Sequence, residues 1–140
     1  MLIRRATYEE AKSIKSFDVF LGDRRIDNWR GELFVCIDGQ EVAGYIAYSS
    51  NLFYNRPYIA QLCVKESHRR KGIARQLVQR VLAIYEGLDV WVSTEDWNQP
   101  AVALFEGAGF KRMGEITGLN RDESREIFFV FRDPHPLIPA

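Results

Sequence analysis

The sequence predicts an α/β fold in which helices flank a mixed sheet of about seven strands. Two local patterns and the chain length support this prediction. An apolar run at 59–64, an amphipathic segment at 73–85 and an alternating segment at 88–93 make a strand–helix–strand unit, whose strands should be parallel with a right-handed crossover. The dipeptide Asp38-Gly39 separates two further apolar runs and predicts a hairpin. A chain of 140 residues has the length of one domain.

The helix of this unit follows from the spacing of its apolar residues. Polar residues fill the opposite face, as expected for a helix that covers a sheet. The strand at 59–64 is almost continuously apolar, which is typical of a strand covered on both faces. The apolar positions of the helix, which recur at steps of three and four residues, are Ile73, Ala74, Leu77, Val78, Val81, Leu82 and Tyr85.

The first part of the chain is predicted to form a strand and a helix. Residues 2–6 are the strand. Thr7 and Glu10 have the spacing of a capping box, which starts a helix. Apolar residues continue the helical pattern through 11–21, and Gly22 is expected to end the helix.

The following segments are predicted to contain the hairpin and two connections. Residues 24–31 are charged, and a short helix and an irregular loop both fit their pattern. The hairpin strands are 33–37 and 42–48, because both residues of the Asp38-Gly39 turn tolerate a positive φ. Residues 49–57 are rich in Asn, Ser and aromatic side chains and are predicted to be a loop.

The C-terminal part is predicted to hold one helix and two strands. The helix is expected at 98–109, because Asn suits its N-cap, Pro its first turn and Gly its end. Strands at 110–116 and 127–131 follow, joined by a polar connection at 117–126. The proline-rich tail at 133–140 is expected to run over the surface of a domain that comprises residues 1–132.

The charge balance excludes two classes of partner. The formal net charge is zero, so we expect no general affinity for nucleic acid or for an anionic membrane. The cations at 69–71 are therefore a local feature, which suits a small anionic ligand better than a polymer. No apolar run approaches about 18 residues, and the first residues lack the core of a signal peptide. We therefore expect a cytoplasmic protein.

The cysteines and histidines give no indication of a metal site. Cys36 and Cys63 lie in apolar strand-like runs and are expected to be buried, reduced thiols, with a disulfide or a nucleophilic role as the alternatives. His68 and His135 are isolated, without the spacing of metal ligands, and both are expected at the surface.

Residues 69–74 have the properties of an anion site. They follow a strand and open a helix, whose first N–H groups have no intrahelical partner and whose dipole favours negative charge. Gly72 has no Cβ, so a phosphate can approach the main chain closely. Three adjacent cations, Arg69, Arg70 and Lys71, add positive charge where the dipole already favours an anion.

Two sequence motifs connect this site to a known family. Arg69-x-x-Gly72-x-Ala74 resembles the acyl-CoA signature of the GCN5-related N-acetyltransferases, and a Leu62-x-Val64 strand end precedes it at the family's distance. Downstream, Asn98-x-x-Ala101-x-x-Leu104-Phe105-x-x-x-Gly109-Phe110 looks like the family's helix that begins with Asn and ends in Gly-Phe. The motifs occur in the family's order, and the resemblance covers nearly the whole chain.

The resemblance implies a splayed parallel strand pair and acetyl-CoA as the cofactor. Backbone groups of Leu62, Cys63 and Val64 would hold the pantetheine arm, and the Leu62 amide would polarise the thioester carbonyl. Asn98 would contact the pantetheine, and Phe105 is also expected among the cofactor-binding residues. The pyrophosphate would be held by the main chain of Arg69, Arg70, Lys71, Gly72, Ile73 and Ala74.

The sequence departs from the family pattern at three positions. Many relatives carry at the position of Phe105 a Tyr that protonates the leaving thiolate, and a phenylalanine cannot do so. Relatives that acetylate histones place a Glu where Tyr58 stands, and relatives that act on protein N-termini place one where Ser93 stands. Deprotonation of the amine is then expected to run through water. The candidate groups for this step are Tyr58, Gln61, Glu95 and Asp96.

We therefore expect an N-acetyltransferase that transfers acetyl from acetyl-CoA to a primary amine of a small molecule, by direct attack in a ternary complex. Two alternatives remain open. One is a non-catalytic, regulatory CoA-binding module, which the absent Tyr and Glu favour. The other is an enzyme that acetylates a protein N-terminus or lysine. The resemblance also leaves open a homodimer formed through the C-terminal strands.

Overall fold

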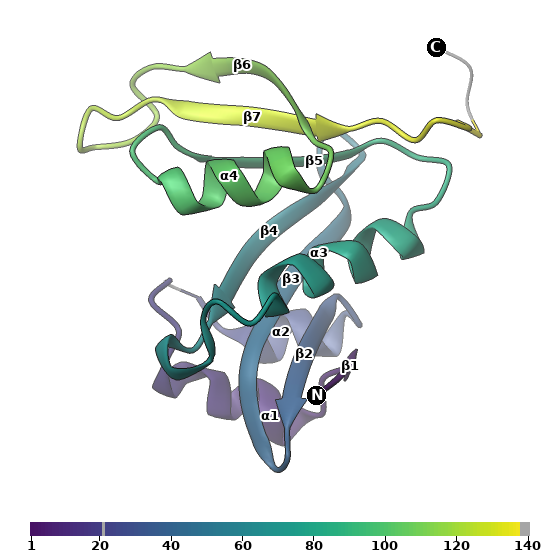
Figure 1. The fold of residues 1–140 in the computed structure, drawn as a ribbon, viewed down its shortest axis with the longest axis vertical. Coiled ribbons are helices and arrows are strands. Elements are labelled where there is room, and N and C mark those ends of the chain that lie inside the picture. The colour runs from purple at the N-terminus through teal and green to yellow at the C-terminus, as the bar shows by residue number, and fades with distance from the viewer. Residues whose placement is uncertain (21, 138–140) are drawn as a thin grey trace. The chain divides into compact units, whose positions relative to one another are not determined.

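The computed structural model describes residues 1–20 and 22–137 (Figure 1). Leu21, in the predicted first helix, and residues 138–140, in the predicted tail, lie outside the described residues. The strands are β1 (Leu2–Arg5), β2 (Leu33–Asp38), β3 (Glu41–Phe53), β4 (Arg56–Val64), β5 (Val90–Glu95), β6 (Lys111–Ile116) and β7 (Glu126–Phe131). The helices are α1 (Tyr8–Ser13), α2 (Arg24–Trp29), α3 (Ile73–Ile84) and α4 (Gln99–Gly107), with 3₁₀ turns η1 (Ile14–Ser16) and η2 (Glu66–His68).

The described strands form one seven-stranded sheet in the order β1-β2-β3-β4-β5-β7-β6. The register of β4 and β5 is parallel at Tyr58↔Trp91, whereas β1–β2, β2–β3, β5–β7 and β6–β7 are antiparallel. The predicted α/β class with a mixed sheet is thereby confirmed. The chain forms two compact units, and each has its own packing. The first comprises Met1–Ser49 and Ile59–Val81, and the second Ser50–Tyr58 and Leu82–Ala140.

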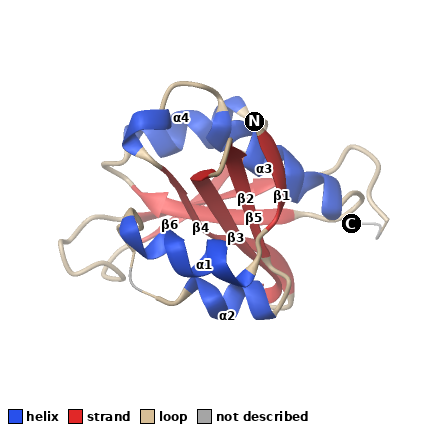
Figure 2. Ribbon diagram, turned by 90° about the horizontal axis from the view of Figure 1, so that it is seen from below, coloured by secondary structure: helices blue, strands red, loops and turns tan. Residues whose placement is uncertain are grey.

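In the first unit, helices cover both faces of the strands. Helices α1 and α2 lie beside each other on one face, and α3 lies on the other (Figure 2). Strand β2 is apolar at five successive residues, and all five are buried, because alternate side chains point to the two covered faces. On the α1 side, Ile14 and Tyr45 are among the fully buried residues of the core. On the other side, Arg80 of α3 lies 5.3 Å from the ring of Phe34.

In the second unit, strand β7 carries aromatic residues on both faces of the sheet. On one face, Phe105 of α4 packs against Phe129 of β7 with ring centroids 6.1 Å apart. On the other, Phe53 stacks on Phe128 at 5.6 Å and on Tyr58 at 5.2 Å. Period-two alternation along β7 therefore sends successive side chains into two different aromatic clusters.

The first helix ends earlier than its apolar pattern predicts. Helix α1 and the 3₁₀ turn that follows it end at Ser16, and Val19 is 74% exposed. The capping box of Thr7 and Glu10 is confirmed at the other end of the helix. The prediction of helix beyond Ser16 was wrong because Asp18 turns inward, where its carboxylate accepts a hydrogen bond from Tyr45 Oη at 2.6 Å. That long-range contact competes with continued helix.

Two predicted connections between strands differ from those in the structure. Asp38 pairs with Glu41, so the β2–β3 loop is Gly39-Gln40 and begins one residue later than expected; only Gly39 has a positive φ there, at 64°. Residues 49–57 are strand rather than loop, apart from the turn residues Tyr54 and Asn55, which both have positive φ values. Two successive residues with positive φ are typical of a tight hairpin, which reverses the chain without a longer loop. The segment 24–31, whose sequence fits both a short helix and an irregular loop, contains α2.

The tail is held against the second unit in its described part. Asp133 Oδ2 accepts a hydrogen bond from Gly87 N at 2.7 Å, and Leu137 N donates to Gly87 O at 2.8 Å. None of the helices in the described ranges 1–20 and 22–137 is long and apolar enough to cross a membrane.

The Tyr45–Asp18 contact generates a stability prediction. Replacing Tyr45 by Phe removes the hydroxyl donor and leaves the largely buried Asp18 carboxylate with the Phe20 N–H, at 3.1 Å, and with Arg24, 3.5 Å away. We expect Tyr45→Phe to lower the free energy of unfolding by about 1–3 kcal/mol, measured by urea denaturation. Tyr8→Phe is the control, because the Tyr8 ring is exposed, and its effect should stay within about 0.5 kcal/mol. Equal stability of the two variants would contradict this role of Asp18.

Candidate active site

The basic turn before α3 is anchored by a buried histidine. His68 is only 7% exposed, so the prediction of a surface position was wrong; His135 is exposed as predicted. His68 Nε2 lies 3.0 Å from Asp38 Oδ2, and Nδ1 lies 2.8 Å from Ser67 Oγ. The contact with Asp38 ties the 3₁₀ turn η2 to the end of β2. Thirty residues separate the two partners in sequence, which is why the sequence pattern did not indicate it.

The turn at the start of α3 is exposed, and its main chain is open to solvent at Gly72. Arg70 and Gly72 have φ values of 64° and 77°, and α3 begins at Ile73 as predicted. A Cβ built on Gly72 meets nothing closer than the Gln76 amide nitrogen at 4.0 Å, so space for a ligand remains in front of the main chain. The first N–H groups of α3 have no acceptor within the helix. The side chains of Arg69, Arg70 and Lys71 are exposed beside them.

The strand end before this turn packs closely against β3. Lys65 N donates to Ala43 O at 2.8 Å, and a Cβ on Gly44 would lie 3.0 Å from Cys63 O. Arg69 Nε donates to Val64 O at 3.2 Å and so folds back onto the end of β4. In the first unit the structure thus brings together the predicted residues 62–64 and 69–74.

The predicted residues Asn98 and Phe105 belong to the second unit. Asn98 Oδ1 accepts from Ala101 N at 3.2 Å, which confirms the predicted N-cap of α4. Phe105 is 4% exposed and packs against Phe110 and Phe129. The Phe105 ring is therefore part of the core of this unit and carries no hydrogen-bonding group.

A chain of three polar side chains lies next to the aromatic cluster of the second unit. Tyr58 Oη lies 2.6 Å from Ser93 Oγ, and Ser93 Oγ donates to Glu126 Oε2 at 2.7 Å. Asn120 Nδ2 donates to the other carboxylate oxygen, Glu126 Oε1, at 3.0 Å. Sequence reasoning named Tyr58 and Ser93 but missed Glu126. Glu126 and Ser93 are 33 residues apart, and only the pairing of β5 with β7 brings them into contact.

Other candidate bases have different surroundings. Asp96 Oδ2 forms an ion pair with Arg125 Nε at 3.3 Å. Glu95 lies directly across the strand pair from Glu126, and Thr94 Oγ1 donates to it at 3.5 Å. Of the carboxylates considered, Glu126 is the one in hydrogen-bond contact with the Tyr58–Ser93 pair.

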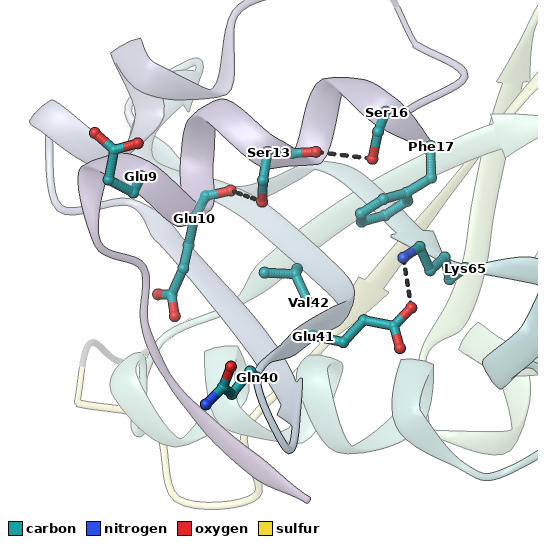
Figure 3. Close-up of a pocket in the computed structure, with 9 residues that line it drawn as sticks. All are labelled: Glu9, Glu10, Ser13, Ser16, Phe17, Gln40, Glu41, Val42 and Lys65. Atoms are coloured by element: carbon teal, nitrogen blue, oxygen red, sulfur yellow. Dashed lines mark hydrogen bonds and ion pairs between the residues drawn. The ribbon is translucent and has the colours of Figure 1, made fainter.

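A pocket of about 370 Å³ in the first unit contains none of the predicted site residues (Figure 3). It lies between α1, its 3₁₀ extension and the β2–β3 hairpin. Glu41 Oε1 pairs with Lys65 Nζ at 2.5 Å, and Glu10 pairs with Arg4. Two carboxylates of the lining, Glu10 and Glu41, are therefore each paired with a cation.

The sequence of this chain is similar to those of known proteins. The model of the acetyltransferase (GNAT) family matches residues 2–110. N-alpha-acetyltransferase 30 of Xenopus laevis is 37% identical over 93 residues, which are 62% of this chain and 34% of the relative. The chain therefore spans about a third of the length of this curated relative.

Solved structures share the fold at low sequence identity. A GNAT-family acetyltransferase from Bacillus cereus superimposes with a TM-score of 0.81 at 22% identity, over 94% of this chain and 96% of that one. A structure of the NatC complex bound to Gag peptide and CoA gives a TM-score of 0.76 at 20% identity, over 94% and 97% of the two chains. At these identities the likeness establishes the fold alone.

The two cysteines generate a reactivity prediction. Both are free and buried, as predicted, and burial raises the pKa of the Cys36 and Cys63 thiols. A raised pKa means that both stay protonated at neutral pH, where the thiol is a poor nucleophile. We expect both thiols of the native protein to react slowly with a chromogenic disulfide reagent and rapidly once urea unfolds the chain. Fast reaction of either thiol in the native state would contradict this.

Proposed function

Because the chain belongs to the acetyltransferase (GNAT) family, we propose that the protein transfers the acetyl group of acetyl-CoA to a primary amine. The observation that carries this proposal is the open, positively charged turn at 69–74, where the family signature coincides with the start of α3. Here a positive φ, helix N–H groups and three cations occur together. A phosphate bound there would receive charge and several donors at once.

The residues of the first unit fit the phosphate end of acetyl-CoA. The main chain of Arg69, Arg70, Lys71, Gly72, Ile73 and Ala74 would hold the pyrophosphate, with the exposed cations beside it. The His68–Asp38 contact would keep this turn in place before the ligand arrives. A turn that is already ordered loses less conformational entropy on binding.

The remaining predicted residues would serve the acyl end. Leu62, Cys63 and Val64 would supply backbone hydrogen bonds to the pantetheine arm, and the Leu62 N–H would stabilise the negative charge that develops on the thioester oxygen. One such donor contributes about 3–4 kcal/mol. The family resemblance assigns a pantetheine contact to Asn98, whereas the Phe105 ring is 4% exposed and belongs to the core of the second unit.

The chain's residues favour direct transfer without an acyl-enzyme. Neither cysteine is exposed or ionised, so neither is suited to take the acetyl group first. Acetyl-CoA supplies an activated acyl carbon, and the amine would attack that carbon directly. The thiolate that leaves is stable enough to depart without a donor at position 105, since a free thiol has a pKa of about 8.5.

The α-amino group of a peptide or protein is the acceptor that we propose. The similarity to an N-alpha-acetyltransferase, at 37% identity over 93 residues, supports this class of amine. The small-molecule amine expected from the sequence is the alternative.

Binding of acetyl-CoA can be tested with a matched pair of variants. Gly72 and Gly39 both have a positive φ in an open site, so a side chain strains the backbone similarly at each. We expect Gly72→Glu to weaken acetyl-CoA binding at least about tenfold, because a carboxylate would face the phosphates. Gly39→Glu should leave the affinity at the wild-type value in calorimetric titrations.

Three outcomes of this titration are informative. Binding by wild type that weakens with Gly72→Glu and not with Gly39→Glu supports the site. Equal losses in both glycine variants would indicate a general folding defect, and unchanged affinity in Gly72→Glu would place the cofactor elsewhere.

The acceptor can be identified by thiol release. We expect release of CoA thiol from acetyl-CoA with at least one member of a peptide panel that presents every N-terminal residue, and a mass increase of one acetyl group on its α-amino group. Turnover with polyamines or amino sugars instead would favour a small-molecule acceptor. Binding of acetyl-CoA without turnover on either panel would favour the non-catalytic module.

A further inference from the structure

We infer that Glu126 is the final acceptor of the proton that the amine must lose, and that Ser93 and Tyr58 carry the proton to it. This inference rests on the proposed function and names the residues that complete it. All three side chains lie in the second unit, on strands β4, β5 and β7. The conclusion follows from the direction of two short hydrogen bonds.

The direction of the hydrogen bonds is set by the carboxylate. Ionised Glu126 can only accept, so the single hydroxyl hydrogen of Ser93 points to Glu126 Oε2, 2.7 Å away. Ser93 Oγ can then only accept from Tyr58, whose Oη is 2.6 Å away. The hydroxyl hydrogen of Tyr58 is thereby committed to Ser93. What Tyr58 Oη offers to a third group is a lone pair, which suits an amine N–H donor.

Two sets of contacts hold this chain of groups in place. Asn120 Nδ2 donates to Glu126 Oε1 at 3.0 Å and fixes the carboxylate orientation. The ring of Tyr58 stacks on Phe53, which also packs against Trp91 at 5.5 Å and Phe128 at 5.6 Å. Rigid positioning of this kind is what proton transfer at 2.6–2.7 Å requires.

Tyr58 is unsuited to act alone as the base. Burial, with a further contribution from the negative charge of Glu126, raises the pKa of the Tyr58 hydroxyl, although the Ser93 hydrogen bond acts in the opposite direction. The hydroxyl therefore stays protonated at neutral pH. A neutral phenol can pass a proton on only if a further group accepts its own, and Glu126 is placed to do so.

The ammonium group gives one proton to Tyr58 Oη as the Tyr58 proton moves to Ser93 Oγ and the Ser93 proton moves to Glu126 Oε2. The neutral amine then uses its lone pair to form the C–N bond, and the C–S bond breaks with its electron pair on sulfur. A second proton from nitrogen goes to the thiolate. Glu126 returns its proton to solvent before the next turnover.

The first test is the kinetics of Glu126→Gln, with a synthetic peptide that bears a free α-amino group as the acceptor. Glutamine keeps the shape and can still accept from Ser93, but it cannot take up the proton. We expect kcat at pH 7 to fall about 100-fold, with the Kd for acetyl-CoA unchanged. Glu115→Gln is the matched control, since it removes the same charge from the neighbouring strand β6, where its ion pairs are exposed. Its kcat should equal that of wild type.

The pH profile separates proton transfer from a structural role. Without Glu126, turnover depends on amine already deprotonated in solution, so the deficit should shrink as the pH rises toward the pKa of the amine. A deficit that is constant across pH would overturn the inference. Tyr58→Phe should cost about as much as Glu126→Gln, and the double variant little more, because the groups act as a unit.

A measurement without turnover tests the connection itself. The titration of Tyr58 can be followed by NMR of protein labelled at the tyrosine ring carbon bonded to oxygen, with Tyr58→Phe to assign the signal. Removing the charge of Glu126 should lower the pKa of Tyr58 in Glu126→Gln. An unchanged titration would overturn the connection whether or not the protein is active.

These results distinguish failure of the inference from failure of the proposed function. Wild-type thiol release with undiminished turnover in Glu126→Gln would overturn the role of Glu126 and leave acetyl transfer intact. Absence of thiol release in the wild type would overturn the proposed function and this proton route with it.

Discussion

The antiparallel register of β5 and β7 is the constraint on which the proposed proton path from Tyr58 to Glu126 depends. Six residue pairs, from Val90↔Phe131 to Glu95↔Glu126, fix which side chains of the two strands share a face. Ser93 and Glu126 are diagonal neighbours in that register, on the face that also carries Phe128. A shift of one residue would turn Glu126 to the opposite face, toward the Phe105–Phe129 cluster, and break the hydrogen bond. Because Ser93 lies between Tyr58 and Glu126, the register also determines that the Tyr58 hydroxyl directs its hydrogen to Ser93 and presents a lone pair to a third group.

Each unit has a polar side-chain contact that would support one part of the proposed chemistry. In the first, His68 holds the basic turn to Asp38 and leaves the cations of that turn exposed for an anion. In the second, Asn120 holds Glu126 in position for Ser93. In both cases a buried or half-buried side chain supports the group that would meet the ligand. Such support is expected wherever geometry must be kept to within a fraction of an ångström.

Local features of the sequence were sufficient for much of the fold and for part of the site. Three features could be predicted because each depends on residues only a few positions apart: the capping box at Thr7, the N-cap at Asn98 and the glycine turn before α3. The errors occurred where residues distant in sequence determine the local structure. Asp18 accepts a hydrogen bond from Tyr45 and does not continue the helix, and His68 contacts Asp38 in place of solvent. Glu126 could not be predicted for the same reason, since nothing near Ser93 in the sequence indicates which residue of β7 lies beside it.

The most direct test of the central claim is to move the carboxylate along the proton path. Ser93 Oγ is 2.6 Å from Tyr58 Oη, so a glutamate at position 93 could contact the phenol without an intermediate hydroxyl. We would measure kcat for the double variant Ser93→Glu/Glu126→Gln beside Glu126→Gln alone. If Glu126 serves as the proton acceptor, kcat of the double variant should be at least about tenfold higher than kcat of Glu126→Gln. A double variant as slow as Glu126→Gln, with acetyl-CoA binding intact, would contradict the account.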